Sequence, residues 1–574
     1  MKKRLYSKIP LSQTIVALCE AKGIHHVVIS PGSRNAPLTI GFTENPEMQC
    51  YSIVDERCAA FFALGIAQQI RKPVALVCTS GSALLNYYPA ISEAFYSDIP
   101  LVILSADRPV ERIDIGDGQT IRQKNVFDNH ILYSANLYSE IVPEIAIEDI
   151  KVKQKQHEAQ KHNEREINLA LNVAIQENGP VHINVPFYEP LYDTLEKPTV
   201  FPKNIPVEFT EHRISKTLYA NMLDEWNGAN RKLILIGVNY PNVIDQKWID
   251  LLANDPSVLV LTETTSNIHH YSHINCIDQL ITSLEENDFM KLQPDVLLTF
   301  GGMVVSKRIK AFLRKYQPKV HWHIDEKKAY DTYFCLTEHI KMNPNKFLLD
   351  FLPKTTVTVN DYKSYWISVR ERRRAKHKEY VEKVDFTDLK AFEAIFDAIP
   401  NHQMIQLSNS STVRYAQLFS LNPSFSVFCN RGTSGIDGST STAIGAAIVS
   451  NTPTTLLTGD LSFFYDSNGL WNNYIPSNFK IILINNGGGG IFRILPGKSE
   501  SDNFSTYFET KHNLTAEQLC TMFQINYHKA AELDTLLEKL QELYKNNESP
   551  QLLEVFTPRK VNDSVLIDYF KHFI

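Results

Sequence analysis

The chain has 574 residues, of which 43% are hydrophobic and 21% charged, and its net charge is −6. This composition is typical of a globular protein, and the small negative charge argues against nucleic acid as the main partner. The eight cysteines, without a Cys-x-x-Cys spacing, indicate reduced thiols. We find neither a signal-peptide core nor a run of 18 apolar residues, so we expect a cytoplasmic protein without membrane insertion.

Helix-like and strand-like segments alternate over the first third of the chain. Residues 11–21 and 59–70 predict helices, and the predicted strands are 26–29, 73–78, 100–104 and 180–186. Each of these strands is followed by a polar turn, as in parallel α/β sheets. We therefore predict a doubly wound first domain over residues 1–190.

The middle of the chain repeats this pattern after a Pro-rich linker at 195–209. Predicted strands at 232–237, 257–261, 295–300 and 320–324 give a central α/β domain over residues 210–355. Gly301 and Gly302 are weak evidence of a nucleotide site, and we assign no cofactor there. A second linker at 352–359 leads to a third α/β domain over residues 380–574.

The most informative segment runs from Thr458 to Phe492. Apolar strands at 454–457 and 481–484 each end in a turn rich in Gly, Asp or Asn, and the residues between them suffice for a crossover helix. The pattern predicts a βαβ unit with both turns at the carboxyl ends of neighbouring parallel strands, where open α/β sheets bind ligands.

These two turns offer one carboxylate and one amide. Asn486 follows Asp460 by 26 positions (486 − 460), and glycines occupy 487–490. Such a set suits Mg²⁺ shared with a diphosphate better than a cage made wholly of protein. The alternative is structural, with Asp460 as an ordinary N-cap and Asn486-Gly487 as a plain turn.

The pair resembles the fingerprint of thiamine-diphosphate (ThDP) enzymes, in which Gly-Asp is followed after roughly 25 to 30 residues by Asn-Asn. The resemblance implies a metal, Mg²⁺ or Mn²⁺, held by Asp460, Asn486 and the backbone carbonyl of Gly488. One departure is Gly487, which stands where many ThDP enzymes carry a polar residue.

A ThDP enzyme also needs a carboxylate for the pyrimidine ring of its cofactor. Glu56 fits this role, because it follows a short strand and precedes an apolar helix. The alternative is that Glu56 has only a structural role, in which its negative charge at the start of the helix interacts favourably with the helix dipole. In ThDP enzymes the two cofactor ends are usually held by different subunits. The resemblance therefore implies a homodimer or homotetramer.

Motifs along nearly the whole chain narrow the resemblance to one family. They are Ser30-Pro31-Gly32-Ser33-Arg34-Asn35-Ala36-Pro37-Leu38, Asp55-Glu56-Arg57, Thr79-Ser80-Gly81, Ala106-Asp107-Arg108-Pro109, Gln119-Thr120-Ile121-Arg122-Gln123, Ser306-Lys307-Arg308 and Arg431-Gly432-Thr433-Ser434-Gly435-Ile436-Asp437-Gly438. They resemble the 2-succinyl-5-enolpyruvyl-6-hydroxy-3-cyclohexene-1-carboxylate synthases of menaquinone biosynthesis. This implies a transferase with three ThDP-type α/β domains that decarboxylates 2-oxoglutarate and adds the succinyl unit to isochorismate.

Both implied substrates are dianions, and arginine suits carboxylate binding. Six cations follow predicted strands or their turns: Arg34, Arg108, Lys307, Arg308, Arg414 and Arg431. The family resemblance places Ser33, Arg34, Arg108 and Gln119 at isochorismate. It places Ser410, Arg414, Arg431 and Lys307, with Arg308, at substrate carboxylates, and Ile491, Phe492 and Leu495 at the wall of the reaction space. The resemblance also implies that Ile436 lies under the cofactor. Other residues implied to contact the cofactor are Pro31, Thr79, Asn86, Gly459, Leu461 and Ser462.

Two other functions stay open at this point. One is a ThDP carboligase that acts on pyruvate, such as an acetohydroxyacid synthase, although the many basic residues exceed what one carboxylate needs. The other is a non-catalytic ThDP-binding regulator, which would be expected to lack Glu56 or the metal ligands.

Overall fold

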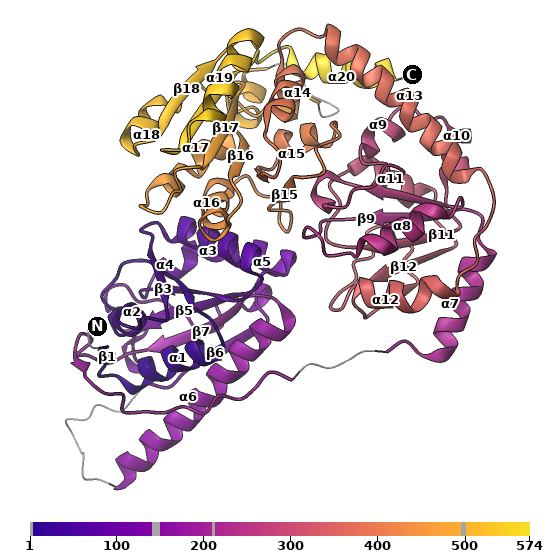
Figure 1. Cartoon of the computed structure of the whole chain (residues 1–574). Coiled ribbons are helices and arrows are strands. Elements are labelled where there is room, and N and C mark those ends of the chain that lie inside the picture. Colours follow the sequence, from indigo (N-terminus) through magenta and orange to yellow (C-terminus); the bar gives the residue numbers. More distant parts are fainter. Residues whose placement is uncertain (1–3, 140–149, 209–212, 495–500, 574) are drawn as a thin grey trace. The chain divides into compact units, whose positions relative to one another are not determined.

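The structure is a computed structural model that describes residues 4–139, 150–208, 213–494 and 501–573. It contains three α/β domains with parallel sheets, as the sequence predicts (Figure 1). The chain divides into two compact units. The first comprises Met1–Phe209, Gly432–Asn451 and Ser462–Phe479, and the second comprises Thr210–Arg431, Thr452–Leu461 and Lys480–Ile574. Among the described helices, none combines the length and apolar character that crossing a bilayer requires.

The sheet of the first domain is parallel throughout, with strand order β3-β2-β4-β5-β7-β6. Every residue of β4 and β5 is buried, so helices cover both faces of the sheet. The strands are β2 (His26–Ile29), β3 (Gln49–Ser52), β4 (Val74–Cys78), β5 (Leu101–Asp107), β6 (Tyr133–Asn136) and β7 (Val181–Pro186), and β1 (Tyr6–Ser7) pairs separately with β8 (Thr194–Leu195). The helices are α1 (Pro10–Ala21), α2 (Ala36–Thr43), α3 (Glu56–Ile70), α4 (Ala83–Asn86), α5 (Tyr88–Ser97) and α6 (Ile150–Glu177).

Two glycines allow helices α3 and α16 (Ser439–Val449) of the first unit to pack closely. A Cβ atom on Gly65 would lie 2.0 Å from the carbonyl oxygen of Thr442, and one on Gly445 would lie 2.0 Å from that of Phe62. Because no larger residue fits at either position, this contact fixes the helix that begins with Glu56.

The middle domain has a parallel sheet of strand order β10-β9-β11-β12-β13. Its strands are β9 (Lys232–Ile236), β10 (Val258–Thr262), β11 (Val296–Phe300), β12 (Val320–Ile324) and β13 (Glu338–Ile340). Its helices are α7 (Lys216–Gly228), α8 (Gln246–Asn254), α9 (Ile277–Ile281), α10 (Glu286–Leu292), α11 (Lys307–Lys315), α12 (Pro344–Phe351) and α13 (Tyr362–Lys383).

Alternate residues of the middle strands enter two separate cores. Ile234 and Ile236 pack with α7, α8 and α12, whereas Leu233 and Leu235 pack with α9, α11 and α13. This alternation is the strand period of two, and it makes the sheet doubly wound.

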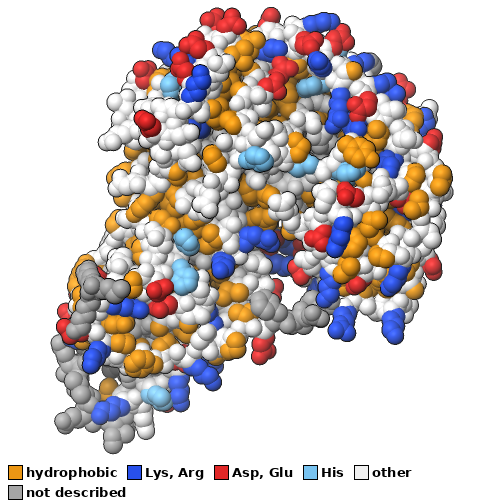
Figure 2. All heavy atoms as spheres, viewed as in Figure 1, with side chains coloured by type: hydrophobic (Ala, Val, Ile, Leu, Met, Phe, Trp, Pro, Cys, Tyr) orange, Lys and Arg blue, Asp and Glu red, His pale blue; other side chains and the backbone are white. Residues whose placement is uncertain are grey.

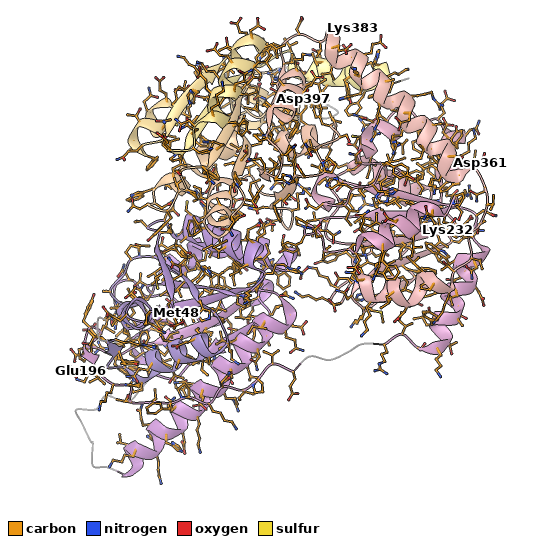
Figure 3. The ribbon with its side chains drawn as sticks, in the orientation of Figure 1. Met48, Glu196, Lys232, Asp361, Lys383 and Asp397 are labelled. Carbon is orange, nitrogen blue, oxygen red and sulfur yellow. The ribbon has the colours of Figure 1, made fainter. Side chains whose placement is uncertain are left out.

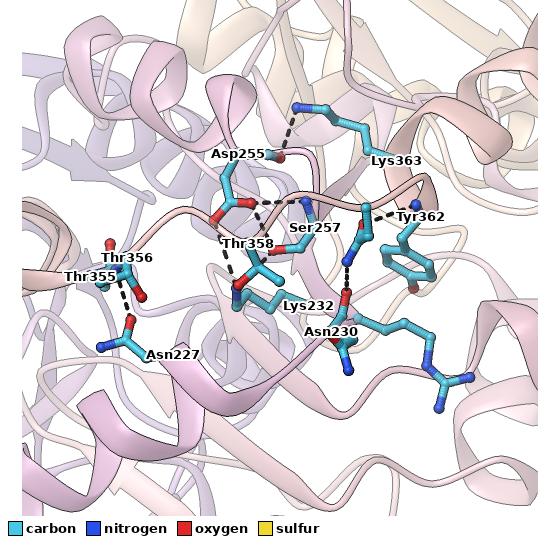
Figure 4. Close-up of polar contacts among 12 residues, drawn as sticks. Asn227, Asn230, Lys232, Asp255, Ser257, Thr355, Thr356, Thr358, Tyr362 and Lys363 are labelled. Atoms are coloured by element: carbon cyan, nitrogen blue, oxygen red, sulfur yellow. Dashed lines mark hydrogen bonds and ion pairs between the residues drawn. The ribbon is translucent and has the colours of Figure 1, made fainter.

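Polar contacts fasten residues 355–363 to the middle domain (Figure 4). The fully buried Lys232 donates through Nζ to Ser257 Oγ at 2.7 Å and to Thr358 Oγ1 at 3.0 Å, and it forms an ion pair with Asp255 at 3.7 Å. Thr356 N donates to Asn227 Oδ1, and Lys363 Nζ donates to the carbonyls of Ala253 and Asp255. The chain that leaves the domain therefore stays attached to it up to α13, and Figure 3 shows Lys232 and Asp361 in this region.

The third domain, orange to yellow in Figure 1, has a parallel sheet of strand order β15-β14-β16-β17-β19-β18. Its strands are β14 (Met404–Leu407), β15 (Ser426–Cys429), β16 (Thr454–Gly459), β17 (Lys480–Asn485), β18 (Asn526–Ala530) and β19 (Gln551–Phe556). Besides α16, the helices are α14 (Asp388–Ala398), α15 (Ser411–Ala416), α17 (Asp460–Tyr465), α18 (Glu517–Met522), α19 (Leu533–Lys545) and α20 (Asn562–His572).

The predicted strands agree with the structure to within a few residues, and the surface agrees with the mixed composition. On the face drawn in Figure 2, acidic and basic side chains are interspersed. The predicted domain limits of 1–190, 210–355 and 380–574 stay predictions. Helix α13 covers most of the interval between the last two of these domains, and it packs against the core of the middle domain through Trp366 and against that of the third domain through Val381.

Candidate active site

The turns that follow β16 and β17 are adjacent. These strands are parallel neighbours, with Gly459 paired to Ile484. Asp460, which begins α17, and Asn486, which follows β17, therefore leave the sheet at the same edge. The predicted βαβ unit is present, although its crossover consists of the short α17 and a 3-10 turn at Ser467–Leu470.

The Asp460 carboxylate is buried in the second unit, with 4% of the residue exposed. Its Oδ1 accepts from Leu461 N at 2.6 Å, and its Oδ2 accepts from Gly488 N at 2.9 Å. His512 Nε2 lies 3.3 Å from Oδ2. The carboxylate is thus held in place, without a ligand, against the turn formed by residues 487–490, called the glycine turn below.

The conformation and surroundings of the glycine turn explain its composition. Gly487 and Gly488 have φ values of +74° and +143°, which side chains disfavour. A Cβ on Gly488 would lie 2.7 Å from the Glu509 carbonyl oxygen, and one on Gly487 would lie 3.3 Å from that of His512. Segment 509–512 therefore lies against the turn. This contact, with the positive φ, accounts for the glycine at position 487, where many ThDP enzymes carry a polar residue.

A buried ion pair fastens that segment. Glu509, which is fully buried, accepts from Arg493 Nε at 2.8 Å and Nη2 at 2.6 Å, and Arg559 Nη1 lies 3.3 Å from the same carboxylate. Its backbone oxygen accepts from Gly489 N at 2.6 Å. The glycine turn is therefore supported by a bidentate charged contact that the sequence did not reveal.

Two further buried carboxylates hold the Asn485-Asn486 pair, and sequence reasoning missed both. Glu554 Oε1 accepts from Asn485 Nδ2 at 2.7 Å, and Asp388 Oδ2 accepts from Asn486 Nδ2 at 3.0 Å. Burial raises the pKa of Asp388 to about 6, against hydrogen bonds from Thr557 and Asn486 that lower it. No local motif marks either acid, because each is distant from the pair along the chain.

These residues fit a divalent cation. Asp460 supplies a carboxylate, Asn486 an amide oxygen that accepts no hydrogen bond from the described residues, and Gly488 a carbonyl. The Gly488 carbonyl accepts from Gly490 N at 3.0 Å and keeps a second lone pair. Gly459 leaves open space beside them, since a Cβ there would meet only Thr412 Oγ1, at 3.8 Å. Oxygen ligands with open positions suit Mg²⁺ or Mn²⁺, and within the described ranges no group of three His, Cys, Asp or Glu residues forms a competing site.

The turn after β14 carries an unusual backbone. Ser410 has φ +67° and ψ −124°, a conformation that costs a non-glycine residue of order 1–3 kcal/mol and is common at functional sites. Ser408 Oγ accepts from Gly459 N at 3.3 Å, so this turn contacts the Asp460 turn.

Basic side chains collect in the same unit. Asn409 Oδ1 accepts from Arg431 Nη1 at 2.7 Å, and burial, followed by the charge of Arg431, lowers the pKa of Arg414. Lys307 begins α11 after the N-cap Ser306, whereas the Arg308 guanidinium stacks 4.5 Å above the Phe570 ring. Lys310, which we did not predict, lies close enough to Arg431 and Lys307 for their charges to lower its pKa, after burial.

Two of the apolar residues predicted to line the reaction space, Ile491 and Phe492, lie beside the glycine turn. Ile491 and Phe492 belong to the 3-10 helix Gly490–Ile494, and the Phe492 ring lies 6.3 Å from that of Phe508. Leu495 falls outside the described residues.

Glu56 stands at the first turn of α3 in the first unit. Asp55 caps this helix by accepting from Cys58 N at 3.2 Å, and Asn86 Nδ2 lies 3.4 Å from Glu56 Oε2. Burial raises the pKa of Cys78 and of Tyr87, and the nearby Glu56 charge adds to both shifts. Glu56 is therefore a half-buried carboxylate close to the fully buried side chains of Cys78 and Tyr87.

The predicted residues of the turns after β2 and β4 are in direct contact. A Cβ on Gly32, between Pro31 and Ser33, would lie 2.3 Å from Thr79 Cβ. The exposed Gln119 accepts through its backbone oxygen from Ser80 Oγ at 2.9 Å. Gln123, named in a motif but given no role, is buried and accepts from Gly81 N at 3.0 Å.

The two arginines of the first domain that we predicted at the site, Arg34 and Arg108, each donate to protein oxygens. Arg34, 9% exposed, donates to Phe187 O at 3.2 Å and to Glu189 Oε1 at 3.1 Å. Arg108 donates to Gly118 O and to Thr120 Oγ1. Burial and the Arg108 charge lower the pKa of Arg34, so the two cations lie near each other.

The loop before α16 completes the first unit. Ser462 Oγ donates to Ile436 O at 2.7 Å, and the Ile436 side chain is 38% exposed. Glu93, which sequence reasoning missed, accepts from Gly432 N and Thr433 N, both at 2.7 Å. The described site residues are thus divided between the two units, with Glu56 in the first and Asp460 in the second.

Comparison with known protein families matches three successive domains in the chain. Residues 9–131 match the thiamine pyrophosphate enzyme N-terminal TPP binding domain, residues 207–406 the middle domain of thiamine pyrophosphate, and residues 409–555 the C-terminal TPP binding domain. Relatives named 2-succinyl-5-enolpyruvyl-6-hydroxy-3-cyclohexene-1-carboxylate synthase come from Christiangramia forsetii (60% identity, 98% of this chain and 99% of the relative) and Flavobacterium psychrophilum (57%, 99% and 100%). A third, from Porphyromonas gingivalis, is 36% identical over 97% of this chain and 96% of its own length.

Proposed function

Because the chain belongs to the 2-succinyl-5-enolpyruvyl-6-hydroxy-3-cyclohexene-1-carboxylate synthase family of ThDP enzymes, we propose that it decarboxylates 2-oxoglutarate and adds the succinyl unit to isochorismate. This places the transferase in menaquinone biosynthesis. The observation that carries the proposal is 60% identity to a synthase of that name over nearly the full length of both chains.

We assign the metal to the second unit. Asp460, Asn486 and the Gly488 carbonyl hold Mg²⁺ or Mn²⁺, and Gly459, Leu461, Ser462 and Ile491 contact the cofactor with Ile436, Pro31, Thr79 and Asn86. The buried, already fixed carboxylate of Asp460 supports this assignment, since little side-chain freedom is left to lose on binding.

ThDP, when bound, supplies the electron sink that makes decarboxylation possible. The role we give Glu56 is to share a proton with the pyrimidine ring of the cofactor, and its position beside buried Cys78 and Tyr87 favours this, because a low local dielectric strengthens such a hydrogen bond.

The cations serve the substrate carboxylates in this proposal. Arg34 and Arg108, with Ser33 and Gln119, orient isochorismate. Arg414, Arg431 and Lys307, with Arg308 and Ser410, bind the carboxylates of the 2-oxo acid, and Phe492 and Leu495 exclude water beside them. Arginines already held by backbone and amide oxygens present a pre-arranged planar donor, which suits carboxylate recognition.

A homodimer or homotetramer follows from the family arrangement, in which two subunits share each cofactor. Light scattering of the purified chain tests this part separately, and a monomer that retains full activity would contradict it. The cytoplasmic location stays a prediction.

The decisive experiment incubates the chain with ThDP, Mg²⁺, 2-oxoglutarate and isochorismate while isochorismate loss and CO₂ release are followed. We expect one CO₂ per isochorismate consumed and no reaction when any component is omitted. Glu56→Gln should remove most turnover, whereas the exposed Glu47→Gln should not. CO₂ release from pyruvate in place of 2-oxoglutarate would refute the proposed substrate, and cofactor binding without turnover would favour a regulator.

A further inference from the structure

A side-chain amide can bind a cation only through its oxygen atom. Its oxygen binds metal, whereas its NH₂ group repels it, so a ligand asparagine must be held in one of two orientations related by a half-turn of the amide. Asn486 and the buried Asp460 leave neighbouring strands at the same edge of the sheet, so the negative charge of Asp460 attracts the NH₂ group of Asn486 while no cation is bound.

Asp388 supplies the competing acceptor. Its Oδ2 accepts from Asn486 Nδ2 at 3.0 Å, which leaves the Asn486 carbonyl oxygen without a hydrogen bond from the described residues. Only 2% of Asp388 is exposed, so water does not substitute for it. The contact spans 98 positions, and no motif contains both residues.

Asp388 is itself rigidly placed. It begins α14, whose residues Leu389, Phe392 and Ile395 lie in the core of the third domain. Its Oδ1 accepts from Thr557 Oγ1 at 2.5 Å, and its backbone N donates to Asn562 Oδ1 at 2.9 Å. Oδ2 thus accepts from Asn486 and Oδ1 from Thr557, and the Asn562 side chain also lies against this carboxylate.

We propose that Asp388 is a positioning residue of the metal site, which fixes the amide of Asn486 so that its carbonyl oxygen is left for the cation. The inference rests on the proposed function, because it takes Asn486 as a metal ligand. Asp388 itself touches neither metal nor substrate in this account.

The test measures Mn²⁺ binding in the presence of ThDP, by the electron paramagnetic resonance signal of free Mn²⁺, together with thermal unfolding. Asp388→Leu, which has a similar size and no acceptor, should weaken Mn²⁺ binding by about 10- to 100-fold, as the loss of outer-sphere partners does. Asp388→Asn should restore affinity to within about threefold, because its oxygen can accept from Asn486 and its NH₂ can donate to Thr557. Asp388→Ala replaces the leucine variant if that chain does not fold.

Two controls separate positioning from stability. Thr557→Val removes the other bond to Asp388, so it should lower the unfolding temperature and leave Mn²⁺ affinity unchanged. Asp397→Leu, on the exposed side of the same helix (Figure 3), should change neither quantity. Mn²⁺ affinity that is equal in Asp388→Leu, Asp388→Ala and wild type overturns the inference, as does a loss that Thr557→Val reproduces. A wild-type chain that binds no Mn²⁺ with ThDP overturns the proposed function instead.

Discussion

Glu263 should make the protein less stable as the pH rises. It follows β10, with 3% exposed, and burial raises its pKa from 4.5 to about 7, although hydrogen bonds from Val305 N and Ser306 N, both 2.7 Å long, oppose that rise. A folded state with the higher pKa binds the proton more tightly than the unfolded state does. The resulting stabilisation is fully present below pH 4.5 and is lost as the pH rises through about 7.

The size follows from the same two values. A shift from 4.5 to about 7 corresponds to about 3 kcal/mol in total, and about 2.5 kcal/mol of this falls between pH 5 and pH 8. Glu263→Gln abolishes the titration. The glutamine has one acceptor oxygen for two N–H groups, which costs about 1–3 kcal/mol at every pH. Wild type should therefore lose about 2.5 kcal/mol more than the variant over this range.

Tryptophan fluorescence during urea unfolding measures this difference. Trp226, Trp248, Trp322 and Trp366 lie buried in or against the middle domain, so a Trp471→Phe background confines the signal to it. The free energy of unfolding is compared at pH 5 and pH 8 for wild type, Glu263→Gln and the exposed control Glu286→Gln. Parallel pH dependence in all three chains, within about 0.5 kcal/mol, would refute the raised pKa of Glu263.

Three other substitutions test individual contacts of the fold. Glu509→Gln leaves the Arg493 guanidinium buried without its anion and should lower the free energy of unfolding in urea by about 3–5 kcal/mol; the exposed Glu517→Gln should not, and equal values would contradict the contact. Lys232→Ala removes the hydrogen bonds to Ser257 and Thr358, so amide hydrogen exchange in residues 355–361 should accelerate at least tenfold. The control Lys247→Ala should leave the exchange rates unchanged. Equal rates in all chains would mean that Lys232 does not hold this segment on the middle domain. Gly65→Ala forces a Cβ atom into the Thr442 carbonyl and should lower the free energy of unfolding, measured by calorimetry, by about 1–3 kcal/mol. Gly228→Ala is the control, because nothing lies within 4 Å of a Cβ atom there. An unchanged melting temperature in Gly65→Ala would argue against the close packing of α3 and α16.

Buried parallel strands were the most predictable part of the fold. The run at 320–324 matches β12, and 454–457 and 481–484 lie inside β16 and β17. The run at 481–484 is apolar throughout, as expected for a strand that is covered on both faces, whereas β12 also contains His321 and His323. Four strands at sheet edges, β6, β13, β15 and β18, were not predicted, and neither were the interior strands β14 and β19. Strands β6, β13 and β18 are short and carry polar, half-exposed residues, which is how edge strands avoid further pairing.

The residues of the candidate site also divide into those that the sequence predicts and those that it does not. Asp460, Asn486 and Glu56 stand in turns next to strands or helix starts, where position along the chain already indicates chemistry. Asp388 and Glu554 do not, because their roles depend on hydrogen bonds across the fold, and an isolated acid in a sequence shows nothing of its partner. The ligand roles themselves stay predictions until a cation is bound.

The attachment of residues 355–363 to the middle domain limits where the chain can be cut. A fragment that ends at 355, the predicted boundary, would lose Tyr362, Trp366 and Val369 from one face of the sheet and would leave Leu233 and Leu235 partly uncovered. It would also leave the ammonium group of Lys232 without one of its hydroxyl partners. Anyone who wishes to express this domain alone should therefore carry the gene through the codon for Lys383, the last residue of α13.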